Sequence, residues 1–218
     1  MKTLNLKKVA VVALIAALAS CGGGSGSKLP ANEVLGNVPS IVHQYAQRDS
    51  VIEAEEDAAM SKLNPASEAD WKKAAKIAED FKARQKELDM QYEEALAQEQ
   101  ALIVGKDVPV ETEDGTGYEV TGAKIVELQK SQIVVEFELK ITDIAAATIT
   151  GFSKPQIVVF SQEIDKNGNQ IGRNSAFYID ITSKENGVTA KGKSYMQITR
   201  HDARQMVDFA KIKFVKNK

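Results

Sequence analysis

The segment from Gly187 to Ser194, GVTAKGKS, has the glycine and lysine spacing of a phosphate-binding loop. In such loops backbone N–H groups hold the phosphates, and a helix begins directly after the Lys-Ser pair. Here the residues after Ser194 alternate between polar and apolar types, which predicts a strand. The chain also ends 24 residues later, at Lys218, too soon for a parallel nucleotide-binding sheet. We therefore expect no nucleotide to bind, and we interpret the segment as a glycine-containing strand or bulge.

A second segment, from Asp165 to Asn169, begins like a calcium loop, with oxygen-bearing side chains at alternate positions. A calcium loop needs glycine at its sixth position and a bidentate glutamate at its twelfth. This chain has Gln170 and Ala176 there. Asn167-Gly168 between two apolar runs is instead a strong signal for a hairpin turn. The sequence therefore predicts a turn and no calcium site.

The two histidines, His43 and His201, lie far apart in the chain, and neither has a second His or Cys at metal-ligand spacing. His201-Asp202 could act as an acid–base pair. A solvated turn explains the same two residues, and we favour it. The sequence therefore predicts no metal site and no cofactor.

Two carboxylates, Glu136 and Glu138, fall on one face of a predicted strand, about 7 Å apart. Paired carboxylates at that spacing can do acid–base chemistry. Lys140 shares their face, so a solvated outer surface accounts for all three residues. No serine lies in a recognised nucleophile motif, and we expect the protein not to be an enzyme.

The N-terminus carries a lysine-rich leader followed by an apolar run from Val9 to Leu18. That run is too short to span a bilayer and is typical of a secretory signal. It ends in Leu18-Ala19-Ser20-Cys21, which resembles the lipobox of bacterial lipoproteins. The resemblance implies that signal peptidase recognises Leu18, Ala19 and Ser20 and removes residues 1–20. It also implies that the Cys21 thiol receives a diacylglycerol and that the new amine is acylated.

Gly22, rather than aspartate, follows Cys21. By the same resemblance, this favours the outer membrane over the inner one. No acidic cluster follows, which favours the periplasmic face over the cell surface. Cys21 is the only cysteine, so the exported protein has to fold without an internal disulfide.

The mature chain divides by composition into a flexible tether over residues 21–39, a helical hairpin over 40–104 and a β-domain over 105–218. Ser40 is expected to cap the first helix, which ends near Leu63. Ser67 is expected to cap a second, which runs to about Leu102. Residues 31–104 carry 15 acidic and 8 basic side chains. Nothing in this charge distribution suits nucleic acid, and membrane attachment is expected to depend on the lipid.

Three aromatic residues, Trp71, Phe81 and Tyr92, fall on the second predicted helix. Exposed aromatic side chains in a charged surround often contact a protein partner. The other interpretation, which we favour, is that they pack against the first helix at Tyr45, Ile52 and Ala59.

From Val108 onward the apolar pattern changes to a period of two, which predicts strands. With turn residues between them and no long helix, the strands predict an antiparallel Ig-like β-sandwich, so the fold class is α+β. The predicted strands are 118–127, 133–141, 156–164, 171–182, 188–199 and 209–215. Lysines in the last run, at 211, 213, 216 and 218, are expected to protect an exposed sheet edge.

These patterns predict a lipoprotein of the bacterial outer membrane that acts as a non-catalytic binding or scaffolding module for an envelope protein. The alternative is a β-sandwich lipoprotein that captures a glycan or peptide on loops near Tyr118, Phe152 and Tyr178. An envelope hydrolase is a third hypothesis and would need a pocket that contains His201 and two carboxylates.

Overall fold

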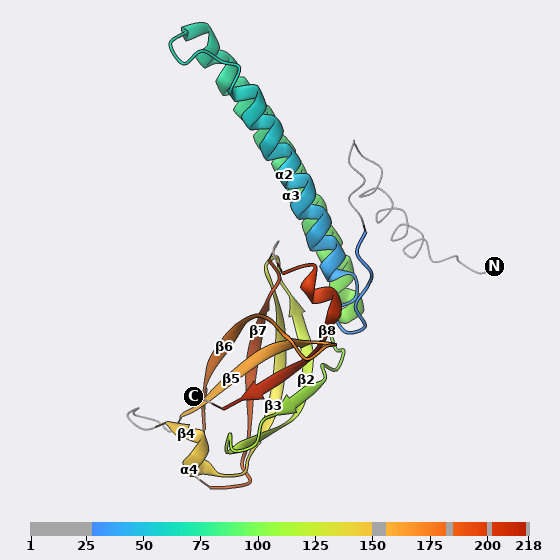
Figure 1. The fold of residues 1–218 in the computed structure, drawn as a ribbon, viewed down its shortest axis with the longest axis vertical. Helices are drawn as coiled ribbons and strands as arrows, with labels where there is room; N and C mark the ends of the chain where they lie inside the picture. The colour runs from blue at the N-terminus through green and yellow to red at the C-terminus, as the bar shows by residue number, and fades with distance from the viewer. Residues whose placement is uncertain (1–27, 150–155, 182–184, 200–201, 217–218) are drawn as a thin grey trace, which may run out of the picture.

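A computed structural model describes residues 28–149, 156–181, 185–199 and 202–216. The fold is α+β: two long helices project from one end of a domain built of β-strands (Figure 1). The predicted signal segment and Cys21 lie outside the described residues, as do Phe152, His201 and Lys218. None of the helices in the described ranges is long and apolar enough to cross a membrane.

The first long helix, α2, spans Val38–Met60. It begins two residues before the predicted Ser40, and Ser40 does not cap it. Pro39 lies in the first turn, where its missing N–H leaves no hydrogen bond unmade. Ser40 is buried inside the helix, where its hydroxyl accepts a hydrogen bond of 3.0 Å from Gln44.

The second long helix, α3, spans Glu68–Ile103, about 54 Å at the usual rise per residue. Its predicted start is confirmed, because the Ser67 side chain accepts a hydrogen bond from the backbone N–H of Asp70. Residues 61–67 connect the two helices, which lie side by side along their length (Figure 1). We call α2 and α3 together the helix pair.

The strands form two sheets. The first has the order β1-β8-β5-β4, with β6 also paired to β5, and the second has the order β2-β3-β7. The strands are β1 Val110–Thr112, β2 Tyr118–Leu128, β3 Gln132–Ile141, β4 Thr148–Ile149, β5 Gln156–Asp165, β6 Gln170–Asp180, β7 Thr189–Gln197 and β8 Phe209–Val215. Two short helical segments, α4 (Ile144–Ala147) and η1 (Gln205–Asp208), complete the described elements. The six longer strands lie within a few residues of their predicted positions.

One strand pair departs from the expected antiparallel arrangement, because β1 runs parallel to β8. The chain leading into β1 first pairs with β2, where the N–H of Val108 donates to Ala123. It then crosses to the other sheet, where Ile212 donates to Pro109. This crossing segment was not predicted, because residues 105–112 contain too short an alternation to indicate a strand.

The prediction that the last strand is a sheet edge is wrong, because β8 lies between β1 and β5. Its lysines have a different role. Lys211 forms an ion pair with Glu111 on β1, and Lys213 approaches the same carboxylate at 3.4 Å. Lys216 is exposed near the C-terminal end of the strand.

The two segments that resembled ligand loops are ordinary parts of the sheets. Most of Gly187–Ser194 lies in β7, with Ser194 fully buried, and the strand continues to Gln197, so no helix begins directly after Lys193-Ser194. Asp165–Asn169 is the turn between β5 and β6, as predicted. The Asp165 carboxylate accepts hydrogen bonds of 2.8 Å from the N–H groups of Asn167 and Asn169.

Candidate functional site

The helix pair is packed tightly only next to the β-strands. There the rings of Tyr45 and Tyr92 stack, with centroids 4.2 Å apart and planes at 23°. The Tyr92 hydroxyl donates 2.8 Å to the carbonyl of Lys130, in the β2–β3 turn, which ties α3 to the sheet. The Tyr45 hydroxyl donates 2.7 Å to Asp89. This hydrogen bond, together with Lys130, lowers the pKa of the Asp89 carboxyl.

Farther from the strands, the two helices of the pair bury no side chains between them. No residue from Glu53 to Glu87 is buried; the outermost buried side chains are Ile52 on α2 and Leu88 on α3. We call residues 53–87 the distal helix pair. Its helices are joined by an exposed ion pair, Arg84 to Glu55 at 2.7 Å. Such pairs contribute little stability in water.

Trp71, the only tryptophan, lies at the start of α3, at the far end of the helix pair. Its side chain is 68% exposed, and the indole N–H donates 2.8 Å to the carbonyl of Pro65 in the connecting segment. The prediction that Trp71 packs against α2 is therefore wrong. Neither the connecting residues 61–67 nor the last turn of α2 covers the Trp71 side chain.

The other two aromatic residues behave differently. Phe81 is half-buried, with the Arg84 guanidinium 4.8 Å from its ring centre. Tyr92 is buried against Tyr45, as predicted. The three aromatic residues therefore become more exposed toward the far end of the helix pair.

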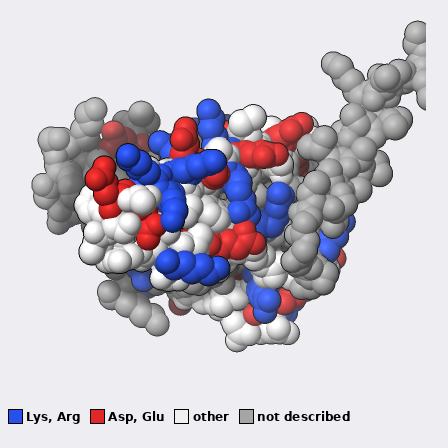
Figure 2. All heavy atoms as spheres, turned by 90° about the horizontal axis from the view of Figure 1, so that it is seen from above, with Lys and Arg blue, Asp and Glu red and all other residues white. Residues whose placement is uncertain are grey.

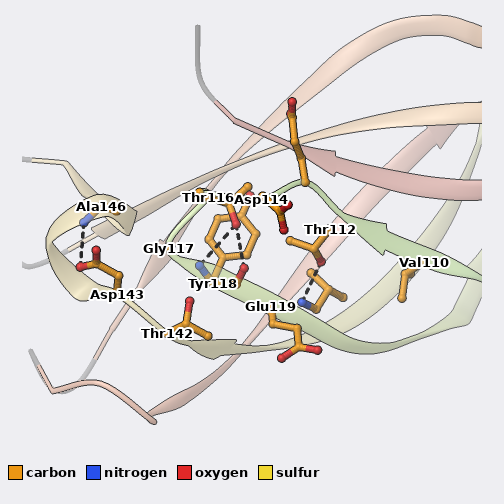
Figure 3. A pocket seen from close by; sticks show the side chains of 13 residues that line it. Val110, Thr112, Asp114, Thr116, Gly117, Tyr118, Glu119, Thr142, Asp143 and Ala146 are labelled. Carbon is orange, nitrogen blue, oxygen red and sulfur yellow. Dashed lines mark hydrogen bonds between the residues drawn. The ribbon is translucent and has the colours of Figure 1, made fainter.

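A pocket of about 480 Å³ opens in the β-domain where β1 and β2 separate, beside the start of α4 (Figure 3). We call it the acidic pocket, because four carboxylates line it: Glu113, Asp114, Glu119 and Asp143. In Figure 3 Asp114 lies beside the Tyr118 ring, and Glu119 lies below both of them.

Two of these carboxylates are already engaged by the backbone. Glu113 accepts a hydrogen bond of 3.0 Å from the N–H of Lys216. Asp143 caps α4 by accepting from the N–H groups of Ala145 and Ala146. Asp114 and Glu119 are exposed and form no hydrogen bond or ion pair with the described residues.

The loop of the pocket depends on glycine at one position. Gly117 has φ +81°, and a β-carbon there would lie 2.5 Å from the carbonyl oxygen of Asp143. The close approach lets the Gly117 carbonyl accept hydrogen bonds from Thr142 and Asp143. Residues 115–117 are thereby held against the end of β3.

Tyr118 forms part of the pocket wall and is only 4% exposed. Burial raises its pKa to about 12, slightly opposed by the nearby backbone of Phe160. The hydroxyl makes no hydrogen bond of acceptable geometry with the described chain, and the Thr148 hydroxyl lacks one as well. Both residues line a second hollow of about 110 Å³, which adjoins the acidic pocket. We call it the inner hollow.

Glu163, on β5, is a buried carboxyl that sequence reasoning missed. It is 8% exposed, and burial raises its pKa to about 7, helped by the negative charge of Asp202. A signal was present, because Glu163 is in phase with the inward-facing Ile157, Val159 and Ser161. It is not among the residues that line the acidic pocket.

The remaining candidate residues are not brought together. His43 is buried on α2, where burial, followed by the charge of Arg204, lowers its pKa. Glu136 forms an exposed ion pair with Lys191 at 3.5 Å, while Glu138 and Lys140 are exposed. Among the described residues, no group of three or more His, Cys, Asp or Glu side chains is arranged to hold a metal ion.

Neither sign of charge dominates the face of the molecule seen from above. Figure 2 shows Lys and Arg interspersed with Asp and Glu on the face seen from above. In comparisons with family models, curated proteins and solved structures, nothing matches this chain.

Proposed function

We propose that this protein is a lipoprotein of the bacterial outer membrane that holds an envelope protein partner at the distal helix pair. The lipobox-like Leu18-Ala19-Ser20-Cys21 supports attachment through a diacylglycerol on Cys21. The proposed orientation is toward the periplasm. The protein acts by binding, without catalysis of its own.

The observation that carries this proposal is the absence of buried side chains from Glu53 to Glu87. Most helical stability comes from packing. Since no side chain of the distal helix pair is buried, this segment contributes little to the stability of the folded core. Its far end nevertheless presents Trp71 to solvent. Tryptophan is among the residues that most often dominate binding energy at protein interfaces. A partner with an apolar pocket for the indole and a mixed-charge rim fits this surface.

In this proposal the helix pair is a helical hairpin that serves as spacer and contact surface, and the strands form an Ig-like β-sandwich. Two sheets with buried inner faces support that description, and Phe137 and Phe214, from the two sheets, pack with ring centres 4.9 Å apart. The crossing segment before β1 is a departure from a simple sandwich.

The test is site-specific photo-crosslinking in intact cells. A photoreactive phenylalanine replaces Trp71, and the matched control carries it at Leu102, which is 59% exposed at the base of α3. We expect one reproducible protein product from position 71 and none from position 102. Cys21→Ala, which cannot be lipidated, should lose or change that product. Products of self-association only, or equal labelling at both positions, would exclude the scaffold.

The second candidate function is capture of a glycan or peptide by the β-domain. The acidic pocket favours it, because ligand sites are concave and several polar side chains converge on this one. An exposed aromatic side chain was expected near Tyr118; Tyr118 lines this pocket but is only 4% exposed. Tyr178 is 62% exposed on β6 and is not among the lining residues.

A further inference from the structure

We propose that the acidic pocket and the inner hollow together bind an alkylammonium group, as on a lysine side chain of a peptide or on a free diamine. This inference rests on the second candidate function and names its ligand chemistry. It does not depend on the partner-binding role proposed for the distal helix pair.

The charge of the side chains that line the acidic pocket favours a cationic ligand. Four carboxylates line the acidic pocket, while Lys216, on the wall of the inner hollow, is the one basic residue lining either space in the described chain. Asp114 and Glu119 are the two carboxylates without a hydrogen bond or ion pair to the described residues. A cation therefore finds two free acceptors there, whereas an anionic ligand would be repelled.

Two hydroxyl groups on the lining, those of Tyr118 and Thr148, lack hydrogen-bond partners among the described residues. Tyr118 is 4% exposed, and both residues line the inner hollow. Buried polar groups without partners are rare in folded proteins and call for an explanation. An ammonium group carries three donors and no acceptor, so it can donate to hydroxyl and carboxylate oxygens alike.

The walls and size of the inner hollow favour an alkyl chain. Ala147, Val158 and Val215 give the inner hollow apolar walls, and its volume is about 110 Å³. A chain of methylene groups suits those walls, since buried hydrocarbon is stabilised by contact with apolar surface. A sugar ring would bring several hydroxyl groups against the same alkyl surface. The observations therefore favour an aliphatic amine over a glycan.

The test is a titration of the full chain, followed by amide chemical shifts. The probes are Nα-acetyl-lysine N-methylamide, as the peptide source, and 1,5-diaminopentane, as the free-amine source. The Nε-acetylated lysine derivative is the neutral control, and N-acetylglucosamine, which carries no charge, represents the glycan alternative. We expect saturable shifts at Gly115, Gly117 and Glu119 with a dissociation constant in roughly the millimolar range. The tighter of the two amine probes identifies the source.

Variants separate binding from folding. The double variant Asp114→Asn, Glu119→Gln should weaken binding about tenfold. Glu138→Gln, an exposed carboxylate elsewhere on the β-domain, should leave it unchanged. Lys216→Gln removes the basic residue that lines the inner hollow and should tighten binding. Tyr118→Phe removes an unsatisfied hydroxyl and should weaken binding without loss of stability.

Several outcomes would overturn the proposal. Equal binding of the acetylated derivative would show that the positive charge is not recognised. Tighter binding of N-acetylglucosamine would assign the pocket to a glycan. No saturable shift with either amine would remove the site altogether. The crosslinking test at Trp71 is unaffected by any of these results, so failure of one proposal can be told from failure of the other.

Discussion

Gly192 on β7 lies directly opposite Phe137 on β3, and the aromatic ring occupies the space where a side chain at position 192 would lie. A β-carbon at Gly192 would come within 2.5 Å of Phe137 Cζ and 2.7 Å of Ile179 Cδ1. Gly192 is the second glycine of the pattern that resembles a phosphate loop. Its role is to make room for an aromatic ring between the sheets.

Gly192→Ala should therefore destabilise the protein. Two buried side chains would have to move, and overpacking of this kind costs about 1–3 kcal/mol of unfolding free energy. Urea denaturation followed by circular dichroism measures it. The matched control is Gly122→Ala on β2, where no atom lies within 4 Å of the added carbon. A control as damaging as Gly192→Ala would contradict the steric explanation.

The buried Glu163 should make stability depend on pH. Its pKa is raised from 4.5 to about 7 in the folded protein, so the folded state holds the proton more tightly than the unfolded state. The contribution to stability is therefore present below pH 4.5 and is lost as pH rises toward 7, by about 3 kcal/mol. Urea midpoints measured across that range should fall for the natural chain, apart from the effects of other groups.

Glu163→Gln keeps the size of the side chain and removes the titration. We expect the variant to be more stable than the natural chain at pH 8 and to show a weaker fall between pH 4.5 and 7. The control is Glu138→Gln, an exposed carboxyl on β3. Parallel pH curves for Glu163→Gln and the natural chain would show that Glu163 does not carry this dependence.

The hydrogen bond from the Tyr92 hydroxyl to Lys130 connects the helix pair to the β2–β3 turn. Tyr92→Phe keeps the ring that stacks on Tyr45 and removes only that bond. We expect a loss of about 1 kcal/mol in unfolding free energy and faster hydrogen exchange in the 129–132 turn. Unchanged exchange there would mean that the helix pair and the turn are coupled in some other way.

The distal helix pair should be dispensable for folding. If residues 56–84 are replaced by a short glycine-rich turn, no buried side chain is lost. The free energy of unfolding of the β-domain should change by less than about 1 kcal/mol. A longer deletion that also removes Ile52 and Leu88 is the matched comparison and should be clearly destabilising. Similar losses in both would show that the distal segment supports the fold.

Trp71 offers a direct optical reading, because it is the only tryptophan. With 68% of its side chain exposed, its emission should lie at long wavelength and be quenched efficiently by iodide. Addition of the partner protein that crosslinking identifies should shift the tryptophan emission to shorter wavelength and protect it from quenching. Phe81→Ala, which lies on α3 between Trp71 and the β-domain, should not alter the tryptophan emission spectrum of the isolated protein. A blue, protected emission in the isolated protein would contradict the exposed position.

Much of the fold followed from the sequence for simple physical reasons. Ser67 caps α3 because a serine just before a helix-forming run can accept from an N–H of the first turn. The long strands lie where the period of two predicted them, since each has one face against the core. Asn167-Gly168 forms its turn for equally local reasons.

What escaped prediction depends on contacts between distant parts of the chain. The parallel pair of β1 and β8 joins Val110 to Ile212, and three residues of strand give no periodic signal. The acidic pocket is assembled from β1, β2 and α4, and none of its carboxylates belongs to a motif. Trp71 was expected to be covered because its spacing fits a helical stripe, but α2 ends at Met60.

The distribution of buried residues along the helix pair has a consequence for how such a chain can change. Insertion of one heptad into each helix would move the tip about 10 Å farther from the β-domain. The core that ends at Ile52 and Leu88 would keep every one of its contacts. The reach of the protein is thus a dimension that can lengthen or shorten in matched steps while the fold stays the same.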